Sequence, residues 1–377
     1  MIIGIPLEIR KHEYRVAITP DIVKKAISLG CEVRIQKNAG ASAKFSDQSY
    51  VDAGATIVSA KQVFSCPLVL KVRAPEPSEI KMMKSGTVII GMLEPFNKTN
   101  IEAMAKQKIT AFSLEVLPRT TRAQSMDVLS SQANIAGYKS VLLASHFYQR
   151  FIPMLMTAAG TIKAARVLVL GAGVAGLQAI ATAKRLGAVV EASDVRPSVK
   201  EQISSLGAKF IDVPYETEEE HKIAAGDSGY AAVMPASWMK RQAGLVAERA
   251  KESDIIIPSA LIPGREPPVL LSEDTIKKMK PGSVVVDLAA GLAKGGSGNC
   301  PLTIANEITV KHEVTLVGYT NLPSMVSTDA SSLYARNVFE FMKLILNEDG
   351  NFNIPNDDEL VSACLLCNEG KIVEEKR

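Results

Sequence analysis

Short apolar runs alternate with stretches of helical periodicity along most of the chain, which predicts parallel strands joined by helices. In the N-terminal third, Thr19, Pro20 and Asp21 open a helix, because Thr is a good N-cap, Pro suits the first turn and an acidic residue favours a helix start. The strands expected in this region are residues 2–6, 32–36, 68–72, 87–92 and 110–113.

A mostly apolar helical pattern over residues 128–147 separates this region from a second series of strands and helices. A later helical pattern over 321–342 predicts that the chain returns to the first domain. We therefore predict an α/β protein with two doubly wound parallel-sheet domains, formed by residues 1–136 plus 320–377 and by residues 137–319. The elements expected in the second series are strands 166–170, 189–193, 255–257, 284–287 and 315–317, and helices 174–186 and 197–206.

Length and charge narrow the possible functions. The chain has 377 residues, which exceeds the roughly 250 residues of a single core and agrees with two domains. The net charge is only +3 and no basic block stands out, so nucleic acid is not expected as a partner. No secretory signal is recognisable, and no apolar run reaches the roughly 20 residues of a membrane span. Direct membrane insertion is therefore not expected.

Five scattered cysteines predict a reducing compartment and no metal site. Cys364 and Cys367 form the one close pair, which also admits a zinc or redox interpretation. Zinc needs four ligands, and no second pair lies at matching spacing. We expect instead a strand over residues 359–366 and a turn at 368–370, with the two thiols packed inside.

The most specific motif is a glycine-rich turn between a strand and a helix. Residues 171–176 read Gly-Ala-Gly-Val-Ala-Gly and follow the apolar run 167–170. Gly171 permits the tight turn, Gly173 lets the backbone approach a pyrophosphate, and Gly176 lets helix and strand pack closely. The helix N-terminus then faces the phosphates with free N–H groups. The predicted phosphate-binding residues are Gly171, Ala172, Gly173, Val174 and Gly176.

An acidic residue in the expected place accompanies this turn. Asp194 ends the next expected strand, 18 residues after Gly176. Its carboxylate can accept hydrogen bonds from the adenosine ribose and repel a 2′-phosphate, so we expect NAD(H) rather than NADP(H). Val195 and Arg196 complete the predicted site, and Arg196 is a side chain that could tolerate such a phosphate. The alternative is a glycine turn that serves packing alone.

Three further stretches carry a family resemblance. They are Arg-Val-Ala-Ile-Thr-Pro at 15–20, the segment 118–134, and Met-Thr-Ala-Ala-Gly at 156–160. Together with the glycine turn and the acidic strand end, they resemble the alanine dehydrogenase and transhydrogenase family. The resemblance covers nearly the whole chain, and residues 119–132 are its most specific segment.

The resemblance implies two Rossmann-like domains with a cleft between them and NAD(H) bound along the second. The likeness is strongest to the NAD(H)-binding component of proton-translocating, Re/Si-specific NAD(P) transhydrogenase. That component is a homodimer that passes hydride to NADP+ on an NADP(H)-binding subunit and sits on a membrane-embedded proton-channel subunit. The implied location is cytoplasmic, peripheral on the inner face of the cytoplasmic membrane through those partners.

The family's nicotinamide-site residues would fall here on Arg119, Gln124, Asp127 and Ser130, and the tyrosine of its mobile loop on Tyr230. The spacing of three between Gln124, Asp127 and Ser130 would place their polar groups along one side of a helical turn. The alternative is that Asp127 and Ser130 only cap the long helix that follows.

Residues 212–235 form a stretch of weak periodicity that contains an acidic run and two glycines beside Tyr230. A loop of that length in a compact domain is commonly a functional lid. The alternative is a solvated insertion.

Hydride transfer between two nicotinamide rings moves no proton on oxygen or nitrogen, so it needs positioning and water exclusion but no general acid. An alanine dehydrogenase would need one, and the resemblance places its Lys on Lys71 and its carboxylate-binding Arg on Arg15. The family's His is missing from the segment 88–96. Alanine dehydrogenase therefore stays as the second hypothesis, and a non-catalytic NAD(H) sensor as the third.

Overall fold

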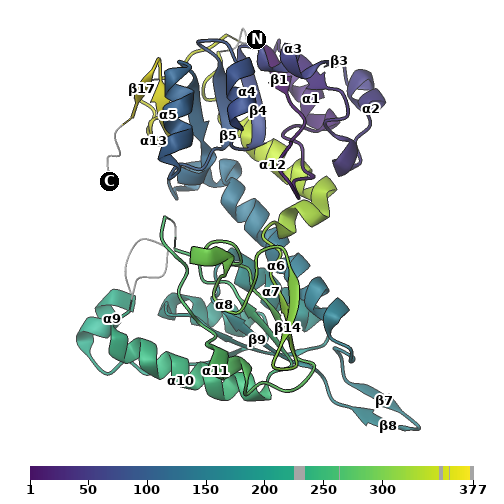
Figure 1. Ribbon diagram of the computed structural model, residues 1–377, viewed down its shortest axis with the longest axis vertical. Coiled ribbons are helices and arrows are strands. Elements are labelled where there is room, and N and C mark those ends of the chain that lie inside the picture. Colours follow the sequence, from purple (N-terminus) through teal and green to yellow (C-terminus); the bar gives the residue numbers. More distant parts are fainter. Residues whose placement is uncertain (225–233, 263, 348–350, 356, 374–377) are drawn as a thin grey trace. The chain divides into compact units, whose positions relative to one another are not determined.

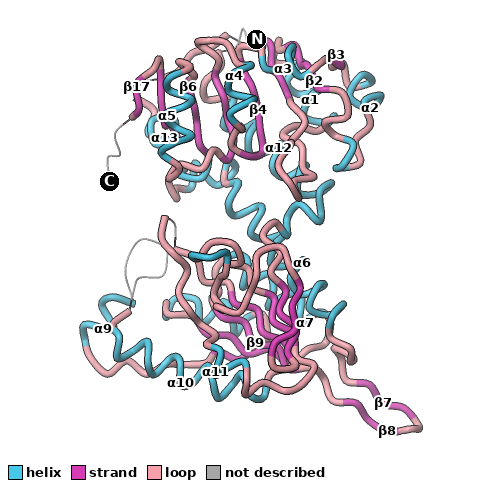
Figure 2. The backbone as a smooth tube through the Cα atoms, viewed as in Figure 1, coloured by secondary structure: helices cyan, strands magenta, loops and turns pink. Residues whose placement is uncertain are grey.

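The computed structural model describes residues 1–224, 234–262, 264–347, 351–355 and 357–373. Contacts divide the chain into two compact units, which we call unit 1 (Met1–Gln132 with Pro323–Arg377) and unit 2 (Ala133–Leu322). Each unit is a sheet flanked by helices (Figures 1 and 2). The predicted α/β class with doubly wound parallel sheets is confirmed.

Unit 1 contains an eight-stranded sheet in the order β17-β16-β6-β5-β4-β1-β2-β3. The six strands from β3 to β6 are parallel, whereas β16 runs antiparallel to β6 and β17 antiparallel to β16. The strands are β1 (Ile2–Ile5), β2 (Glu32–Gln36), β3 (Thr56–Val58), β4 (Leu68–Arg73), β5 (Val88–Met92), β6 (Thr110–Ser113), β16 (Leu365–Asn368) and β17 (Lys371–Ile372).

Both faces of this sheet are buried under helices. Leu68 and Leu70 of β4 belong to a cluster that includes Phe341, whereas Val69 faces a second cluster that includes Met104. This alternation follows from the two-residue period of a strand, and burial of both faces is typical of parallel sheets. The helices of unit 1 are α1 (Pro20–Ser28), α2 (Asp47–Asp52), α3 (Ala60–Phe64), α4 (Pro77–Met82), α5 (Lys98–Lys106), α12 (Ser327–Met342) and α13 (Glu359–Cys364).

Unit 2 contains a seven-stranded sheet in the order β11-β10-β9-β12-β13-β15-β14. Every pair is parallel except β14 with β15. In both units the six parallel strands therefore follow one spatial order, 3-2-1-4-5-6 in chain sequence. The strands of unit 2 are β9 (Arg166–Leu170), β10 (Val189–Ser193), β11 (Lys209–Phe210), β12 (Ile255–Pro258), β13 (Val284–Val286), β14 (Ile308–Lys311) and β15 (Val314–Val317).

Helix α6 (Val128–Phe147) begins in unit 1 and continues into unit 2. A separate two-stranded hairpin, β7 (Leu155–Thr157) with β8 (Gly160–Ile162), extends away from the rest of unit 2 (Figure 1). The other helices of unit 2 are α7 (Val174–Arg185), α8 (Lys200–Ser205), α9 (Glu218–Ala224), α10 (Ala236–Glu252) and α11 (Glu273–Ile276). None of the described helices is long and apolar enough to cross a membrane.

Two sequence predictions were wrong in their secondary structure. Residues 359–364 form helix α13 rather than a strand, because the Asp358 carboxylate caps the N–H groups of Leu360 and Val361 at 2.9 and 3.2 Å. Residues 218–224, expected in a loop, form helix α9, whose acidic first turn favours a helix N-terminus. In both places a local capping or dipole interaction outweighs the weak periodicity.

Candidate functional site

The turn from β9 to α7 spans only three residues, and two of its glycines are sterically required. Gly171 has φ of +96°, a conformation that side chains with a Cβ rarely adopt. A Cβ on Gly176 would lie 1.9 Å from the Gly171 carbonyl oxygen, so only glycine lets α7 start this close to the strand. No described atom lies within 4 Å of the position that a Cβ would take on Gly173. The backbone at Gly173 therefore borders open space that a ligand can approach.

Ser259, which directly follows β12, supports the turn from the neighbouring strand. Its hydroxyl donates to the Gly171 carbonyl at 2.9 Å, and its N–H donates to Leu170 O at 2.8 Å. Val174 is exposed and opens α7, whose first turn presents N–H groups without partners inside the helix. Ser259 was not predicted from the sequence, although its place at the carboxyl end of the strand beside β9 is the signal that could have identified it.

Asp194 is fixed to this turn by a direct hydrogen bond. Its Oδ2 accepts from the N–H of the buried Ala172 at 2.6 Å, and its Oδ1 accepts from the N–H of Arg196 at 2.9 Å. The Arg196 guanidinium also lies on this carboxylate, with Nε 3.0 Å from Oδ1 and Nη2 3.0 Å from Oδ2. These hydrogen bonds raise the pKa of Arg196 above its ordinary value. The expectation of an unpaired charge on Asp194 was wrong, since Arg196 neutralises it.

Val195 connects the strand end to the segment predicted to be a lid. The Tyr215 hydroxyl donates to the Val195 carbonyl at 3.0 Å, and the Tyr215 ring stacks on that of the buried Trp238 at 6.2 Å between centroids. Some of the acidic run is used structurally, because Glu220 accepts from Arg241 at 2.6 Å. The predicted lid residue Tyr230 lies outside the described residues.

The four predicted nicotinamide-site residues line one pocket of unit 1, with a volume of about 320 Å³. They do not share one helix: Gln124 belongs to a 3-10 helix over 121–126, Ser130 lies in α6, and Asp127 stands between the two. The prediction of a single helical turn was therefore wrong, although the spacing of three still directs these side chains to one side. The lining residues are Leu117, Pro118, Arg119, Thr120, Thr121, Ala123, Gln124, Asp127 and Ser130.

Asp127 caps α6 and lines the pocket at the same time. Its Oδ1 accepts from the N–H of Ser130 at 2.8 Å, and its Oδ2 accepts from the Ser130 hydroxyl. The capping alternative is therefore present in the structure, and it orients both side chains. Thr120, which was not predicted from the sequence, has a buried hydroxyl oxygen without a hydrogen-bond partner among the described residues. A polar ligand in this pocket would supply that partner.

Lys71 is a buried structural cation rather than an accessible base. It is 1% exposed, and its ammonium lies 2.8 Å from Glu79 and 3.2 Å from Glu8. Burial alone would lower the pKa of Lys71, but the two carboxylates raise it above its ordinary value. The ammonium therefore stays protonated, and the side chain is poorly suited to act as a base or nucleophile.

Arg15 is likewise used inside unit 1. Its guanidinium donates to both carboxylate oxygens of Glu13, at 2.7 and 2.6 Å, and to Gln132 at 2.8 Å. Arg15 is 3% exposed. Such a bidentate pair occupies the donors that a substrate carboxylate would need.

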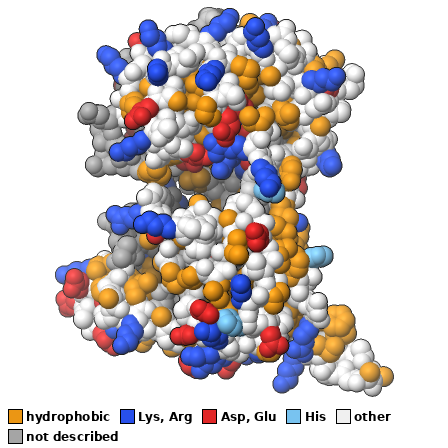
Figure 3. Space-filling model, in the orientation of Figure 1, with side chains coloured by type: hydrophobic (Ala, Val, Ile, Leu, Met, Phe, Trp, Pro, Cys, Tyr) orange, Lys and Arg blue, Asp and Glu red, His pale blue; other side chains and the backbone are white. Residues whose placement is uncertain are grey.

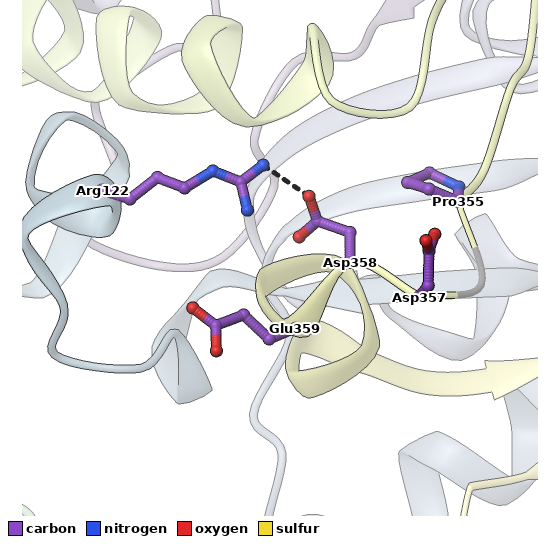
Figure 4. Close-up of a pocket in the computed structure, with 5 residues that line it drawn as sticks. All are labelled: Arg122, Pro355, Asp357, Asp358 and Glu359. Atoms are coloured by element: carbon purple, nitrogen blue, oxygen red, sulfur yellow. Dashed lines mark hydrogen bonds and ion pairs between the residues drawn. The ribbon is translucent and has the colours of Figure 1, made fainter.

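A second pocket of unit 1, about 390 Å³, lies beside the start of α13 (Figure 4). Arg122 donates to Asp358 there, and Asp357 and Glu359 add two further carboxylates (Figure 4). This excess of negative charge disfavours a nucleotide phosphate. Among the described residues no group of three or more His, Cys, Asp and Glu side chains is placed to hold a metal ion.

The five cysteines are free and buried, and none is arranged for redox chemistry. Cys367 donates to Ile109 O at 3.3 Å, and burial raises its pKa to about 11. Burial also raises the pKa of Cys364. Protonated, buried thiols are poor nucleophiles and behave as small apolar side chains.

The chain matches two family models, "Alanine dehydrogenase/PNT, N-terminal domain" over residues 4–136 and "Alanine dehydrogenase/PNT, C-terminal domain" over residues 140–375. It is 46% identical to an NAD(P) transhydrogenase subunit alpha chain of Rhodospirillum rubrum over 99% of this chain and 98% of the relative. A solved transhydrogenase structure from Sinorhizobium meliloti is 43% identical, with a TM-score of 0.85 and 99% coverage of both chains.

Alanine dehydrogenase is a more distant relative. The enzyme of Staphylococcus haemolyticus is 31% identical over 86% of this chain and 82% of its own length. Both family models and the near-complete coverage of these relatives lead to one conclusion, and the resemblance predicted from the motifs is confirmed. The chain belongs to the alanine dehydrogenase/PNT family.

Proposed function

We propose that this chain is the NAD(H)-binding component of an NAD(P) transhydrogenase, and that it passes hydride between NADH and NADP+ held on a partner subunit. Relatives that bear this name match almost the whole chain. The observation that carries the proposal is the β9–α7 turn, where Asp194 is bonded to the turn itself and Gly173 borders open space. The domain division at 136/137 and 319/320 belongs to the proposal, and the two compact units support it.

The residues of unit 2 would hold the adenosine half of NAD(H). The N–H groups at the start of α7 face the pyrophosphate, and the glycine backbone lets it approach. Asp194 accepts the ribose hydroxyls, with Val195 beside it. Tyr230 closes over the bound nucleotide and excludes water.

The pocket of unit 1 would position the nicotinamide. Gln124 and Thr120 offer polar groups to the carboxamide, Asp127 and Ser130 hold each other in place, and Arg119 lines the same pocket. When bound, NADH supplies the hydride and moves no proton on oxygen or nitrogen, so the protein needs to orient the ring and exclude water.

Alanine dehydrogenase is not supported as a second function. That reaction needs proton transfer on nitrogen and oxygen, and the two side chains implied by the resemblance are both buried in ion pairs with glutamates. An isolated chain should show no ammonium-dependent reduction of pyruvate by NADH. A sensor without catalysis has no use for the polar pocket of unit 1.

We include a homodimer in the proposal. The hairpin β7–β8 extends away from unit 2, and beside and within it 60% of Met154 and 72% of Met156 are exposed (Figure 3). Two long apolar side chains at a projecting hairpin cost free energy in water unless another surface covers them. A second copy is the occupant that we propose. A membrane-embedded proton-channel subunit and an NADP(H)-binding subunit complete the assembly and keep the chain on the cytoplasmic face of the membrane.

Hydride exchange with the NADP(H)-binding partner tests the proposal. The purified chain, mixed with that partner, NADH and an NADP+ analogue of distinct absorbance, should transfer hydride at a rate that depends on both proteins. Gln124→Ala should lower this rate about 10- to 100-fold, because a misplaced ring is costly. Gln48→Ala, an exposed glutamine of α2 outside the pocket, is the matched control and should keep the wild-type rate. Absence of exchange with any cognate partner would remove the proposal.

A further inference from the structure

The carboxylate of Asp194 has no acceptor position left for a ligand. A carboxylate offers about four lone-pair positions. Oδ1 accepts from the N–H and the Nε of Arg196, and Oδ2 accepts from the N–H of Ala172 and from Nη2 of Arg196. All four contacts lie between 2.6 and 3.0 Å, and only 4% of the Asp194 side chain is exposed. Ribose hydroxyls can reach this carboxylate only if a present donor leaves.

Only the guanidinium among these donors can move away. The N–H groups of Ala172 and Arg196 belong to the backbone of the glycine turn and of the strand end, which the sheet fixes. The Arg196 side chain is 19% exposed and precedes the exposed Pro197 and Ser198, so its guanidinium has a path toward solvent. Its departure would vacate one position on each carboxylate oxygen, which matches the two hydroxyls of a ribose.

We propose that Arg196 is a specificity-determining latch, whose guanidinium occupies the ribose positions on Asp194 and leaves them when NAD(H) binds. The inference rests on the proposed role of Asp194 in binding NAD(H). Opening the latch breaks two charge-assisted hydrogen bonds, so Arg196 lowers the affinity for the nucleotide and speeds its release.

The same pair sets how strongly a 2′-phosphate is excluded. A bare carboxylate would repel the phosphate, but Arg196 brings the net charge at this point to zero. The displaced guanidinium also stays close enough along the chain to attract a phosphate. Arg196 therefore weakens the discrimination against NADP(H) that Asp194 alone would provide.

Titration of NADH and NADPH against the full chain tests the latch. In Arg196→Met, which keeps the aliphatic stem and removes the donors, we expect the Kd for NADH to fall about three- to tenfold. The ratio of the NADPH Kd to the NADH Kd should rise about tenfold, because the Asp194 charge is then unpaired. Arg196→Lys keeps the charge but loses the two-pronged contact, and should give intermediate values.

Two further variants separate this inference from the proposed function. Asp194→Ala should weaken NADH binding, and unchanged binding would overturn both the proposed ribose contact and the latch. If Asp194→Ala weakens binding while Arg196→Met weakens NADH binding or leaves it unchanged, the latch alone is overturned.

Lys200→Ala is the matched control for the loss of one positive charge near the site. Lys200 is exposed on α8 and pairs with Asp212 at 2.6 Å rather than with Asp194. Its NADH affinity should stay within about twofold of the wild type, since exposed pairs contribute little. A tightening equal to that of Arg196→Met would overturn the latch by showing a general charge effect. If Arg196→Met does not fold, as thermal unfolding would show, Arg196→Lys decides by the same criteria.

Discussion

Units 1 and 2 share the strand order 3-2-1-4-5-6, and in both the order reverses between the first and the fourth parallel strand. Ligands of such sheets bind beside this switch point. In unit 2, three residues join β9 to α7, and Ser259 steadies a turn that borders open space. In unit 1, Glu8 follows β1 and pairs with Lys71 of β4 across the same point.

The difference teaches that one topology can provide either a nucleotide cradle or a filled structural centre. What decides is the first connection: glycines keep the crevice of unit 2 open, whereas the crevice of unit 1 is occupied by buried ion pairs. The pocket of unit 1 instead lies at residues 117–130, beside the start of α6. Four variants test this contrast.

The largest effect is expected where the cradle of unit 2 leaves no room. In Gly176→Ala the new Cβ would meet the Gly171 carbonyl at 1.9 Å, so the turn must shift. We expect a loss of about 3 kcal/mol in unfolding free energy and about 100-fold in NADH affinity. Gly244→Ala in α10, where no described atom lies within 4 Å, should bind NADH normally and be slightly more stable. Chemical denaturation and NADH titration measure both variants, and a Gly176→Ala protein with normal binding would contradict the cradle.

The filled centre of unit 1 should respond in the opposite way. Lys71→Met leaves Glu8 and Glu79 buried without their cation, which should cost about 3–5 kcal/mol of unfolding free energy. The NADH affinity of the folded protein should stay within about twofold. Lys81→Met, at an exposed position of α4, should change stability by less than about 0.5 kcal/mol. If Lys71→Met were as stable as the wild type, the structural role of Lys71 would be wrong.

A third contrast concerns the hairpin that only unit 2 carries. Met154→Ser with Met156→Ser removes apolar area that we propose is covered by a second copy, so the dimer Kd should rise about tenfold or more. The control Val310→Ser changes an equally exposed residue (65%) on β14 and should leave the dimer intact. Light scattering over a dilution series measures both, and an unchanged dimer in the double variant would remove the hairpin from the interface.

The smallest effect belongs to the surface pair at α13. The hydrogen bond from Arg122 lowers the pKa of Asp358 below its ordinary value of 3.8. A lowered folded-state pKa means that the pair contributes stability above about pH 4 and loses it as pH falls through the lower value. Arg122→Ala should therefore differ slightly from the wild type at neutral pH and match it in acid. A difference that persists in acid would show that Arg122 acts by packing rather than by charge.

Residue patterns were sufficient for several regions of this fold. The glycines at 171–176 and the acidic strand end at Asp194 have local steric and hydrogen-bonding requirements, so their spacing predicted the turn that the structure contains. The spacing within 119–130 likewise predicted polar groups that line one pocket. The strand predicted over 359–366 failed because Asp358, just before it, was not recognised as a helix cap.

The sequence by itself determined the α/β class, the family and the position of the glycine turn, because periodicity and motif spacing depend on near neighbours along the chain. Only the tertiary structure decided which charges are paired: Glu8 with Lys71, Glu13 with Arg15 and Gln132, and both Asp194 oxygens with Arg196. The physical reason is that the free energy of a charge depends on its burial and on the partners within a few ångströms. Residues as far apart as 8 and 71 become such partners only when the strands that carry them pair.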